Sequence, residues 1–433
     1  MKSSKIKEFS QIRDFLLLFI GQSLSQIGSA MTSFALIIWA YRKQGTVMSI
    51  ASLSVFSYLP YVIVSIFAGA LIDKFKKKNI LLVCDAVAAL CTLCTLGLYH
   101  FGLLEVWHLY FLNAVSGFMN AFQNPASNAA ISIMVPREQY TRVSGLRSLS
   151  DSLSSVLSPV AATAVISLFG IEAVFMTDLL TFATAFLSLL VFIKIPHKQY
   201  VDEKANIIKE SMKGLAFLKE NKGFLYLIMY LAIINFIAAM AFFGVLPAMI
   251  LTRTSNNETI LGLVQSAIGA GGIVGGLAVS IAKPSKNHVR NVFFSGAISF
   301  VLCDIFMGAG RSHIIWIAAA FAGNLLIPLL NASENYLLMS KIPEYIRGRV
   351  FAVRGTLQFV TLPFGYLAGG LLADKVFEPL MEGTGLIQRL IAGIVGSGSG
   401  SGMAFMFIMT GTTGFLISLI FYRNRHIRAL ESD

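Results

Sequence analysis

The sequence predicts an all-α integral membrane protein, in which twelve transmembrane helices form two pseudo-symmetric six-helix bundles. Three observations support this prediction. Of the 433 residues, 56% are hydrophobic and only 13% are charged, whereas about a quarter of the residues of a soluble globular protein carry a charge. Long apolar segments recur along the whole chain. The two halves of the chain also resemble each other at a fixed offset.

The apolar segments predict twelve spans, because one crossing of the bilayer needs about 20 residues. They lie near residues 12–40, 48–72, 79–101, 106–134, 143–168, 171–194, 224–252, 258–283, 289–309, 313–340, 350–373 and 403–422. The first segment follows several lysines, as in a signal peptide. It is too long for one and no small-residue cleavage site ends it. We therefore expect a retained first span.

The basic residues predict the orientation of these spans. The chain has 34 Lys and Arg residues. If both termini are cytoplasmic, the ones left on the outer side are Arg42, Lys43, Arg253, Arg311, Lys375 and Arg389. This excess of positive charge on the inner side is typical of a multi-pass protein of the bacterial inner or plasma membrane. Topology therefore explains the net charge of +12, and we expect no binding of nucleic acid.

One hydrophilic interval divides the spans into two groups of six. We predict an N-terminal bundle over residues 1–194, a cytoplasmic linker over 195–223 and a C-terminal bundle over 224–433. In the linker, Ile208, Met212 and Leu215 recur at helical spacing among lysines. This pattern favours an amphipathic helix on the anionic inner leaflet. A binding site for a regulatory partner is the alternative.

An internal repeat supports the division into two bundles. An offset of 207 residues places Asn124 on Asn331, Asn128 on Asn335, Pro136 on Pro343, Arg142 on Arg349, and Arg147 on Arg354. Spans four and ten, with the loops after them, are therefore predicted copies. Two parallel six-span repeats are typical of a transporter architecture whose substrate site lies between the halves, near the middle of the membrane.

Two glycine-rich segments have predicted structural roles. In "GAGGIVGG", residues 269–276, Gly271 with Gly275 and Gly272 with Gly276 form small-xxx-small pairs, which allow helices to approach closely. A short amphipathic segment at 386–395 precedes "GSGSGSG" at 396–402. We expect the second run to be a flexible joint before the last span.

The segment "AGALIDKFKKKNILL", residues 68–82, joins spans two and three and carries a recognisable motif. Gly69, Leu71, Asp73, Lys74, Lys77 and Lys78 resemble the G-x-L-a-D-R-x-G-R-K signature of major facilitator superfamily transporters. Lysines replace both arginines, and Lys76 stands where a glycine is usual. "GQSLSQIGSAM", "AFQNPASNAA" and "VPREQYTRVSGLRS" are similar to the macrolide-efflux branch of the drug:proton antiporters. Through span count, repeat and loop, the resemblance covers essentially the whole chain.

The resemblance implies a latch that closes the inner face of the transporter. Its predicted residues are Gly69, Asp73, Lys74, Asp85, Arg142, Arg147, Asp151, Arg349 and Arg354. The lysines after Asp73 have an alternative role as topology anchors. Asp151 follows Arg147 by one helical turn, so a purely structural ion pair between them is an alternative too.

Acids within spans are costly and are therefore functional candidates. They are Asp85, Asp151, Asp178, Asp304 and Glu334. In the superfamily, spans one, four, seven and ten line the cavity, so the resemblance ranks Glu334 first as the proton-coupling residue, with Asp304 in reserve and Asp178 structural. Desolvation would favour the neutral form of Glu334, which could then load a proton on one side and lose it on the other. The alternative is a buried glutamate that bonds to Asn or Arg without any role in coupling.

Polar residues on the cavity-lining spans are the predicted cargo contacts. They are Gln22, Ser25, Gln26, Asn120, Gln123, Asn124, Asn235, Asn331 and Asn335. The chain also holds 34 Phe and 16 Met. Aromatic and thioether side chains adapt their packing, which suits large amphipathic cargo.

The sequence therefore predicts a secondary active transporter. Its expected function is proton-coupled efflux of macrolide-like drugs or natural products by alternating access, and hence multidrug efflux and antibiotic resistance. The alternatives are a lysophospholipid or lipid flippase and a siderophore exporter of the same fold. No Ser/His/Asp set or phosphate loop is present, so we expect neither an enzyme nor a cofactor. The CxxC of Cys91 and Cys94 favours packing over a metal site. The expected partners are a small-molecule substrate, the proton and the lipid bilayer, with the chain as a monomer.

Overall fold

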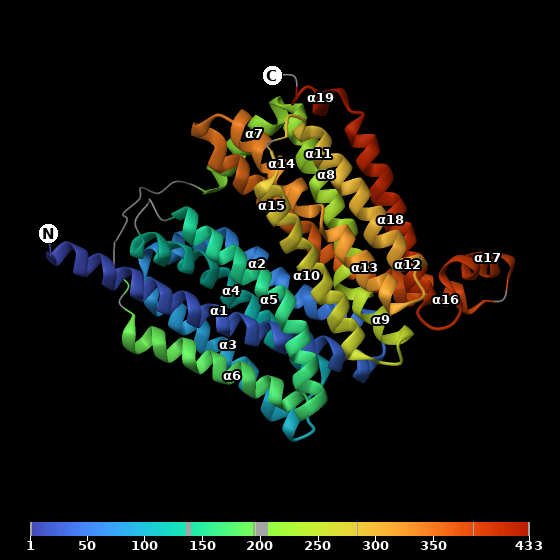
Figure 1. Cartoon of the computed structure of the whole chain (residues 1–433), viewed down its shortest axis with the longest axis horizontal. Helices are drawn as coiled ribbons and strands as arrows, with labels where there is room; N and C mark the ends of the chain where they lie inside the picture. The colour runs from blue at the N-terminus through green and yellow to red at the C-terminus, as the bar shows by residue number, and fades with distance from the viewer. Residues whose placement is uncertain are drawn as a thin grey trace. The chain divides into compact units, whose positions relative to one another are not determined.

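A computed structural model describes residues 2–135, 140–193, 195, 207–283, 285–383 and 385–431. Within these ranges the chain is helical, with short connections and no β-strand (Figure 1). The prediction of an all-helical fold is therefore confirmed. The chain forms two compact units: residues 1–44 with 56–201, and residues 45–55 with 202–433. Each unit is described by itself.

The first unit consists of six long helices and one π-helical turn. They are α1 (Lys2–Gln44), α2 (Val47–Lys74), which begins in the second unit, α3 (Lys77–His100), α4 (Val106–Met134), α5 (Tyr140–Phe169), α6 (Ile171–Leu187) and η2 (Ser188–Phe192). A buried apolar cluster connects them, and it includes Leu18 of α1, Leu81 of α3 and Ala126 of α4. These positions recur on one side of each helix, which is how an apolar helix buries its packing face.

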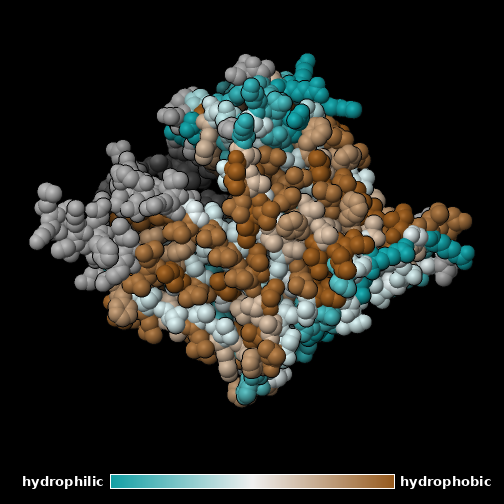
Figure 2. Space-filling model, viewed as in Figure 1, coloured by the Kyte–Doolittle hydropathy of each residue, from teal (hydrophilic) through white to brown (hydrophobic). Residues whose placement is uncertain are grey.

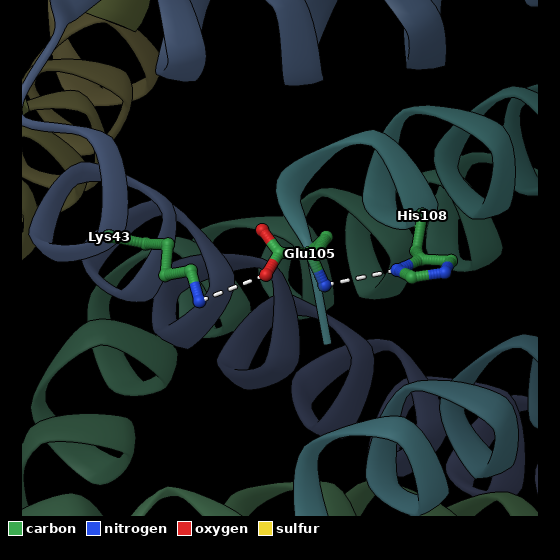
Figure 3. Close-up of polar contacts among 3 residues, drawn as sticks. All are labelled: Lys43, Glu105 and His108. Carbon is green, nitrogen blue, oxygen red and sulfur yellow. Dashed lines mark hydrogen bonds and ion pairs between the residues drawn. The ribbon is translucent and has the colours of Figure 1, made fainter. Parts of the chain in front are cut away.

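An exposed ion pair joins the end of α1 to the beginning of α4 (Figure 3). Lys43 Nζ lies 3.1 Å from Glu105 Oε1. Glu105 is the N-cap of α4, and its backbone N–H donates to His108 Nδ1 at 3.0 Å. Lys43 is one of the basic residues that the sequence places on the predicted outer side. Glu105 neutralises its charge, so the pair adds no net charge there.

The second unit contains the remaining helices. They are α7 (Ile207–Glu220), α8 (Lys222–Ala239), η3 (Met240–Val245), α9 (Leu246–Arg253), α10 (Glu258–Ile281), α11 (His288–Phe300), η4 (Val301–Ile305), α12 (Phe306–Ala309), α13 (His313–Asn324), α14 (Ile327–Lys341), α15 (Glu344–Leu372), η5 (Ala373–Phe377), α16 (Glu378–Glu382), α17 (Leu386–Val395), α18 (Ser401–Tyr422) and α19 (Arg425–Arg428). In its core, the fully buried Tyr230 shares a hydrogen bond of 3.0 Å with Ser418. The buried phenol is therefore satisfied by a polar partner.

Eleven helical segments among the described residues are long and apolar enough to cross a membrane. The helix at the predicted fourth span, α4, is not among them, although it has 29 residues. Its sequence carries Asn113, Asn120, Gln123, Asn124 and Asn128. These side chains lower the hydropathy of α4 and need polar surroundings, as expected of a helix that contributes to a polar interior.

The linker helix packs on the second unit. Leu218 of α7 is fully buried in a cluster with Ile346 and Val350 of α15. Gly214 lies against the backbone carbonyl of Arg349, where a Cβ would clash. Leu215, which the sequence places on the apolar face, is partly exposed. This part of α7 is therefore docked on protein, whereas residues 196–206 lie outside the described residues.

One of the two predicted glycine pairs mediates close helix packing. Gly271 and Gly275 of α10 lie against the backbone carbonyls of Phe321 and Leu325, so a Cβ at either position would overlap these oxygens. Gly272 has no neighbouring atom within 4 Å of such a Cβ. The glycine spacing therefore predicted close helix packing, and α13 contacts the face of α10 that carries Gly271 and Gly275.

The glycine–serine run is held by side chains at both ends, and its flexibility as a joint stays a prediction. Arg311 Nη2 donates to the carbonyl of Ala392 at 3.2 Å, and Arg253 Nη2 donates to that of Val395, so two cations bind the carboxyl end of α17. At the other end of the run, Glu378 accepts hydrogen bonds from the backbone N–H of Gly400 (3.1 Å) and Met403 (2.7 Å), at the beginning of α18. Cations at a helix carboxyl end and an acid at an amino end are both stabilising.

Helix α17 is visibly amphipathic. Leu386, Leu390 and Ile394 are exposed along one side, and Figure 2 shows hydrophobic surface along one edge of α17 and hydrophilic surface along the other. Apolar surface of this kind on a helix is typical of contact with a membrane interface.

A carboxylate of the second unit caps the beginning of α2. Asp374 of η5 accepts hydrogen bonds from the backbone N–H groups of Val47 (3.0 Å) and Met48 (2.9 Å). These are the first two residues of α2, whose amides have no partner within the helix. The first turns of α2 therefore belong structurally to the second unit, in agreement with the division of the chain.

Candidate functional site

The structure describes only the backbone for part of the predicted latch. Gly69, Asp73 and Lys74 fall in α2 and Arg142 falls in α5, but their side chains are not described. The backbone at these positions is helical. Their assignment to a latch stays a prediction.

Asp85 lies in a polar cluster formed by three helices of the first unit. It is 3% exposed. Gln22 of α1 donates to Asp85 Oδ2 at 2.9 Å, and Gln123 of α4 donates to Oδ1 at 2.7 Å. We expected Asp85 in the latch and the two glutamines at the cargo, so the structure joins residues from two predicted groups.

Asp151 and Arg147 do not form the ion pair that their spacing allows. Gln26 of α1 donates to Asp151 Oδ1 at 2.9 Å. Arg147 instead donates from Nη1 to Asn128 Oδ1. Among the side chains that the structure describes, the acid and the base thus have separate amide partners, because each points toward a different neighbouring helix.

The other predicted cargo residues of the first unit differ in exposure. Asn120 and Asn124 of α4 are exposed on the surface of the unit, and Ser25 of α1 is half-buried. Amide groups cannot be satisfied by hydrocarbon. This face of α4 therefore requires contact with water, cargo or protein.

Glu334 forms a buried ion pair in the second unit. It lies on α14 and is 1% exposed. Arg354 Nε of α15 lies 2.6 Å from Glu334 Oε1. Arg354 also donates from Nη1 to Asn335 Oδ1 at 3.3 Å, and its guanidinium lies 5.6 Å from the centroid of the Phe351 ring. Gln358 of α15 also bonds to the carboxylate.

The remaining predicted residues of this unit surround the pair less closely. Asn331 is exposed one turn before Asn335 on α14, and Asn235 is half-buried on α8. Arg349 is half-buried near the beginning of α15 and interacts with a neighbour. Of the predicted cargo and latch residues in this unit, the structure therefore joins Asn335 and Arg354 to Glu334.

The same asparagine–arginine contact occurs in both units, as the internal repeat predicts. Asn128 bonds to Arg147 in the first unit and Asn335 bonds to Arg354 in the second, and the partners are 19 positions apart in each case. Only the second copy carries an acid next to the asparagine, because Ser127 stands at the position of Glu334. The two copies thus share a polar frame but differ in charge.

Two further buried acids have hydroxyl partners. Asp178 of α6 accepts hydrogen bonds, each of 3.0 Å, from Ser29, Thr32 and Thr92. Asp304 lies in the π-helical turn η4 and accepts one from Thr410 of α18 at 3.2 Å. Sequence reasoning did not foresee the three hydroxyls around Asp178. Serine and threonine are common in spans and pack without any distinctive spacing.

Comparisons with known proteins agree with this arrangement. The family model of the Major Facilitator Superfamily matches residues 18–366. Macrolide efflux protein A of Streptococcus pyogenes is 26% identical over 372 residues, which cover 84% of this chain and 90% of that protein. Multidrug efflux pump Tap of Mycolicibacterium fortuitum is 22% identical, over 83% of this chain and 89% of that protein.

Solved structures share the fold at low identity. The nucleoside transporter NupG superimposes with a TM-score of 0.66 at 14% identity, over 94% of this chain and 97% of that one. A bacterial homologue of the iron transporter ferroportin, in an inward-facing state, also has a TM-score of 0.66, at 15% identity, over 95% of this chain and 99% of that one. The family match identifies the chain as a membrane transporter that belongs to the Major Facilitator Superfamily, and the membrane-spanning helices and the asparagine–arginine contact in each unit agree with it.

Proposed function

We propose that the protein is a proton-coupled efflux transporter of amphipathic small molecules that works by alternating access, with both termini in the cytoplasm. The observation that carries the proposal is Glu334, a buried acid that occurs in one copy only of a duplicated asparagine–arginine frame. The names of the similar efflux proteins support the export of small molecules.

The ion pair of Glu334 provides a way to couple a proton to a change in structure. With Glu334 ionised, Arg354 is held at the carboxylate. A proton on Glu334 removes the negative charge, and Arg354 then keeps only Asn335 and the Phe351 ring as neighbours. Because arginine stays charged in proteins, its positive charge becomes available to other partners. Proton uptake on one side and release on the other would thus alternate two arrangements of α14 and α15.

The energy for export would come from the proton gradient. Each charge that moves across a potential of 100 mV contributes about 2.3 kcal/mol. If the cargo binds more tightly while Glu334 is ionised, then proton binding and cargo binding oppose each other. Net inward movement of protons then drives cargo outward.

The proposal is tested with purified protein in liposomes, by following the pH-gradient-driven movement of a fluorescent amphiphile. We expect Glu334→Gln to abolish gradient-driven transport, while Asp178→Asn, a change of the same chemistry at an acid enclosed by hydroxyls, retains it. A protonophore should stop transport by the unchanged protein. If Glu334→Gln still transports at the wild-type rate under a gradient, Glu334 is not the coupling residue.

The same liposomes distinguish the alternative of a lipid flippase. A flippase would move a labelled lysolipid between leaflets without a pH gradient and without loss on addition of the protonophore. That outcome, with no movement of the amphiphile, would replace the proposal of proton-coupled efflux.

A further inference from the structure

The carboxyl group of Asp85 has polar partners that differ in kind from those of Glu334. Both oxygens of Asp85 accept hydrogen bonds from carboxamides, at 2.9 Å from Gln22 and 2.7 Å from Gln123. Gln123 Nε2 also lies 3.4 Å from Gln22 Oε1, which closes a three-residue ring. No ion pair to Asp85 is formed by a described Lys or Arg side chain.

The chemistry of these partners permits two protonation states. A guanidinium only donates hydrogen bonds, so Arg354 favours the ionised form of Glu334. A carboxamide has an NH₂ group that donates and a carbonyl oxygen that accepts. Rotation of the amide by half a turn therefore lets Gln22 or Gln123 bind the ionised or the protonated form of Asp85. A buried carboxylate without a cation is costly, so both forms are accessible at this position.

Among the side chains that the structure describes, no other charge pairs with Asp85 to fix its state. Its helix, α3, packs against α4, α6 and η2, and Gln22 reaches Asp85 from α1. The described titratable side chains of α1, α3, α4 and α6 lie near the ends of the spans, apart from the thiols of Cys84, Cys91 and Cys94 and the carboxyl of Asp178. Lys77 and Lys78, at the beginning of α3, donate to the backbone carbonyls of Ile72, Leu190 and Ile193. Asp178 has its own three hydroxyl donors.

We propose that Asp85 is a second proton-binding site and that its proton reverses the hydrogen-bonding polarity that Gln22 and Gln123 offer to cargo. With Asp85 ionised, both NH₂ groups turn toward it, and the amide oxygens are the groups left to accept bonds from a cationic or hydroxyl-bearing cargo. With Asp85 protonated, its O–H donates to an amide oxygen, so that amide turns and presents NH₂ groups instead. One of the two amide acceptors is thereby replaced by a donor, which disfavours a cationic cargo.

This inference rests on the proposed efflux function and specifies its cargo. The favoured cargo is an amphipathic molecule with a protonated amine or several hydroxyl groups, because amide oxygens bind hydrogen-bond donors. Proton and cargo then oppose each other at the glutamines, as an exchange of the two requires. Gln22 and Gln123 are half-buried, so a small movement of a side chain brings an amide oxygen to the surface of the unit.

Equilibrium binding of ethidium to the purified protein tests the inference without a gradient. Ethidium is a fluorescent cation whose charge is constant between about pH 6 and about pH 9, so any pH dependence belongs to the protein. We expect binding to weaken by about 5- to 150-fold as the pH falls through this range, the usual span of coupling between two sites. Asp85→Asn should bind weakly at every pH, because asparagine is neutral and its own amide competes for the glutamines.

Three further variants separate the possible causes. Gln123→Met keeps Asp85 but removes one reversible amide, so we expect weaker binding at high pH and a smaller pH dependence. Asp178→Asn should bind as the wild type does. Glu334→Gln should weaken binding at every pH, because its neutral side chain imitates protonated Glu334, but the remaining binding should still weaken as the pH falls. The inference is wrong if Asp85→Asn or Gln123→Met keeps the wild-type pH dependence, whereas failure of Glu334→Gln to affect transport would contradict only the proposed efflux mechanism.

Discussion

The ion pair between Glu334 and Arg354 leads to a quantitative prediction about stability. Two unit charges about 4 Å apart attract by about 4 kcal/mol at the effective dielectric constant of a protein, about 20. The side chain of Glu334 is 2% exposed and that of Arg354 is 17% exposed, so neither charge recovers full hydration when the other is removed. We therefore expect Arg354→Gln to lower the free energy of unfolding by about 3–5 kcal/mol, because it leaves a buried carboxylate without a cation.

The two partners should respond differently. Glu334→Gln should cost less than Arg354→Gln, since Arg354 keeps Asn335 as an acceptor and the Phe351 ring, and its partly exposed guanidinium can reach water. The double variant Glu334→Gln/Arg354→Gln has no unpaired charge. Its loss should therefore be smaller than the sum of the two single losses, by about 2 kcal/mol.

The assay is reversible unfolding of the purified protein in mixed micelles, followed by tryptophan fluorescence. The chain has three tryptophans, of which Trp316 is buried in the second unit. Circular dichroism at the same detergent concentrations serves as a second probe of two-state behaviour. Losses that simply add in the double variant would show that Glu334 and Arg354 do not interact energetically, and the coupling mechanism built on them would fail.

Two other predictions follow from the second unit. Gly275→Val should lower the free energy of unfolding by about 1–3 kcal/mol, because the new side chain meets the Leu325 carbonyl. Gly276→Val is the control: the position has open space around it, so the change should be nearly neutral in the same unfolding assay. Arg311→Ala removes hydrogen bonds to the carboxyl end of α17, so we expect about tenfold faster amide hydrogen exchange there. The control is Arg389→Ala, which changes an exposed side chain on α17 itself. Equal effects of the two changes would contradict the role of Arg311.

The sequence predicted the fold well because membrane helices leave a strong local signal. Length and hydropathy place each apolar segment, and an acid within such a segment identifies itself as costly. Burial of Glu334 was predictable for this reason. The internal repeat also predicted that Asn128 and Asn335 occupy corresponding positions, and both bond to the arginine 19 residues later.

The partners of the buried acids were not predictable in the same way. Asp85 bonds to residues 63 and 38 positions away, on two other helices, and no spacing rule connects them. The spacing of Arg147 and Asp151 favoured a local pair, yet Asn128 and Gln26 supply better-placed partners from neighbouring helices. Which faces of the helices meet is decided by packing across the unit, which periodicity alone does not determine.

The composition of the glycine–serine run did not reveal the contacts at its ends, for a related reason. Glycine and serine favour a flexible chain when nothing else binds the backbone. Here Arg253 lies 142 residues before the carbonyl that it binds, so the restraint is invisible in a local window. Composition describes the freedom of a segment in isolation, and distant side chains can remove it.

The fixed ends of this run have a practical consequence for anyone who engineers the protein. A stretch that reads like a laboratory linker invites the insertion of an epitope tag or a cleavage site. An insertion between Val395 and Gly400 would pull the amides that Glu378 holds away from it, or free the carbonyl that Arg253 binds. Tags belong elsewhere, while helix α17, held at its end by two guanidinium groups, offers a firm handle on its hydrophilic side for an antibody fragment in electron microscopy.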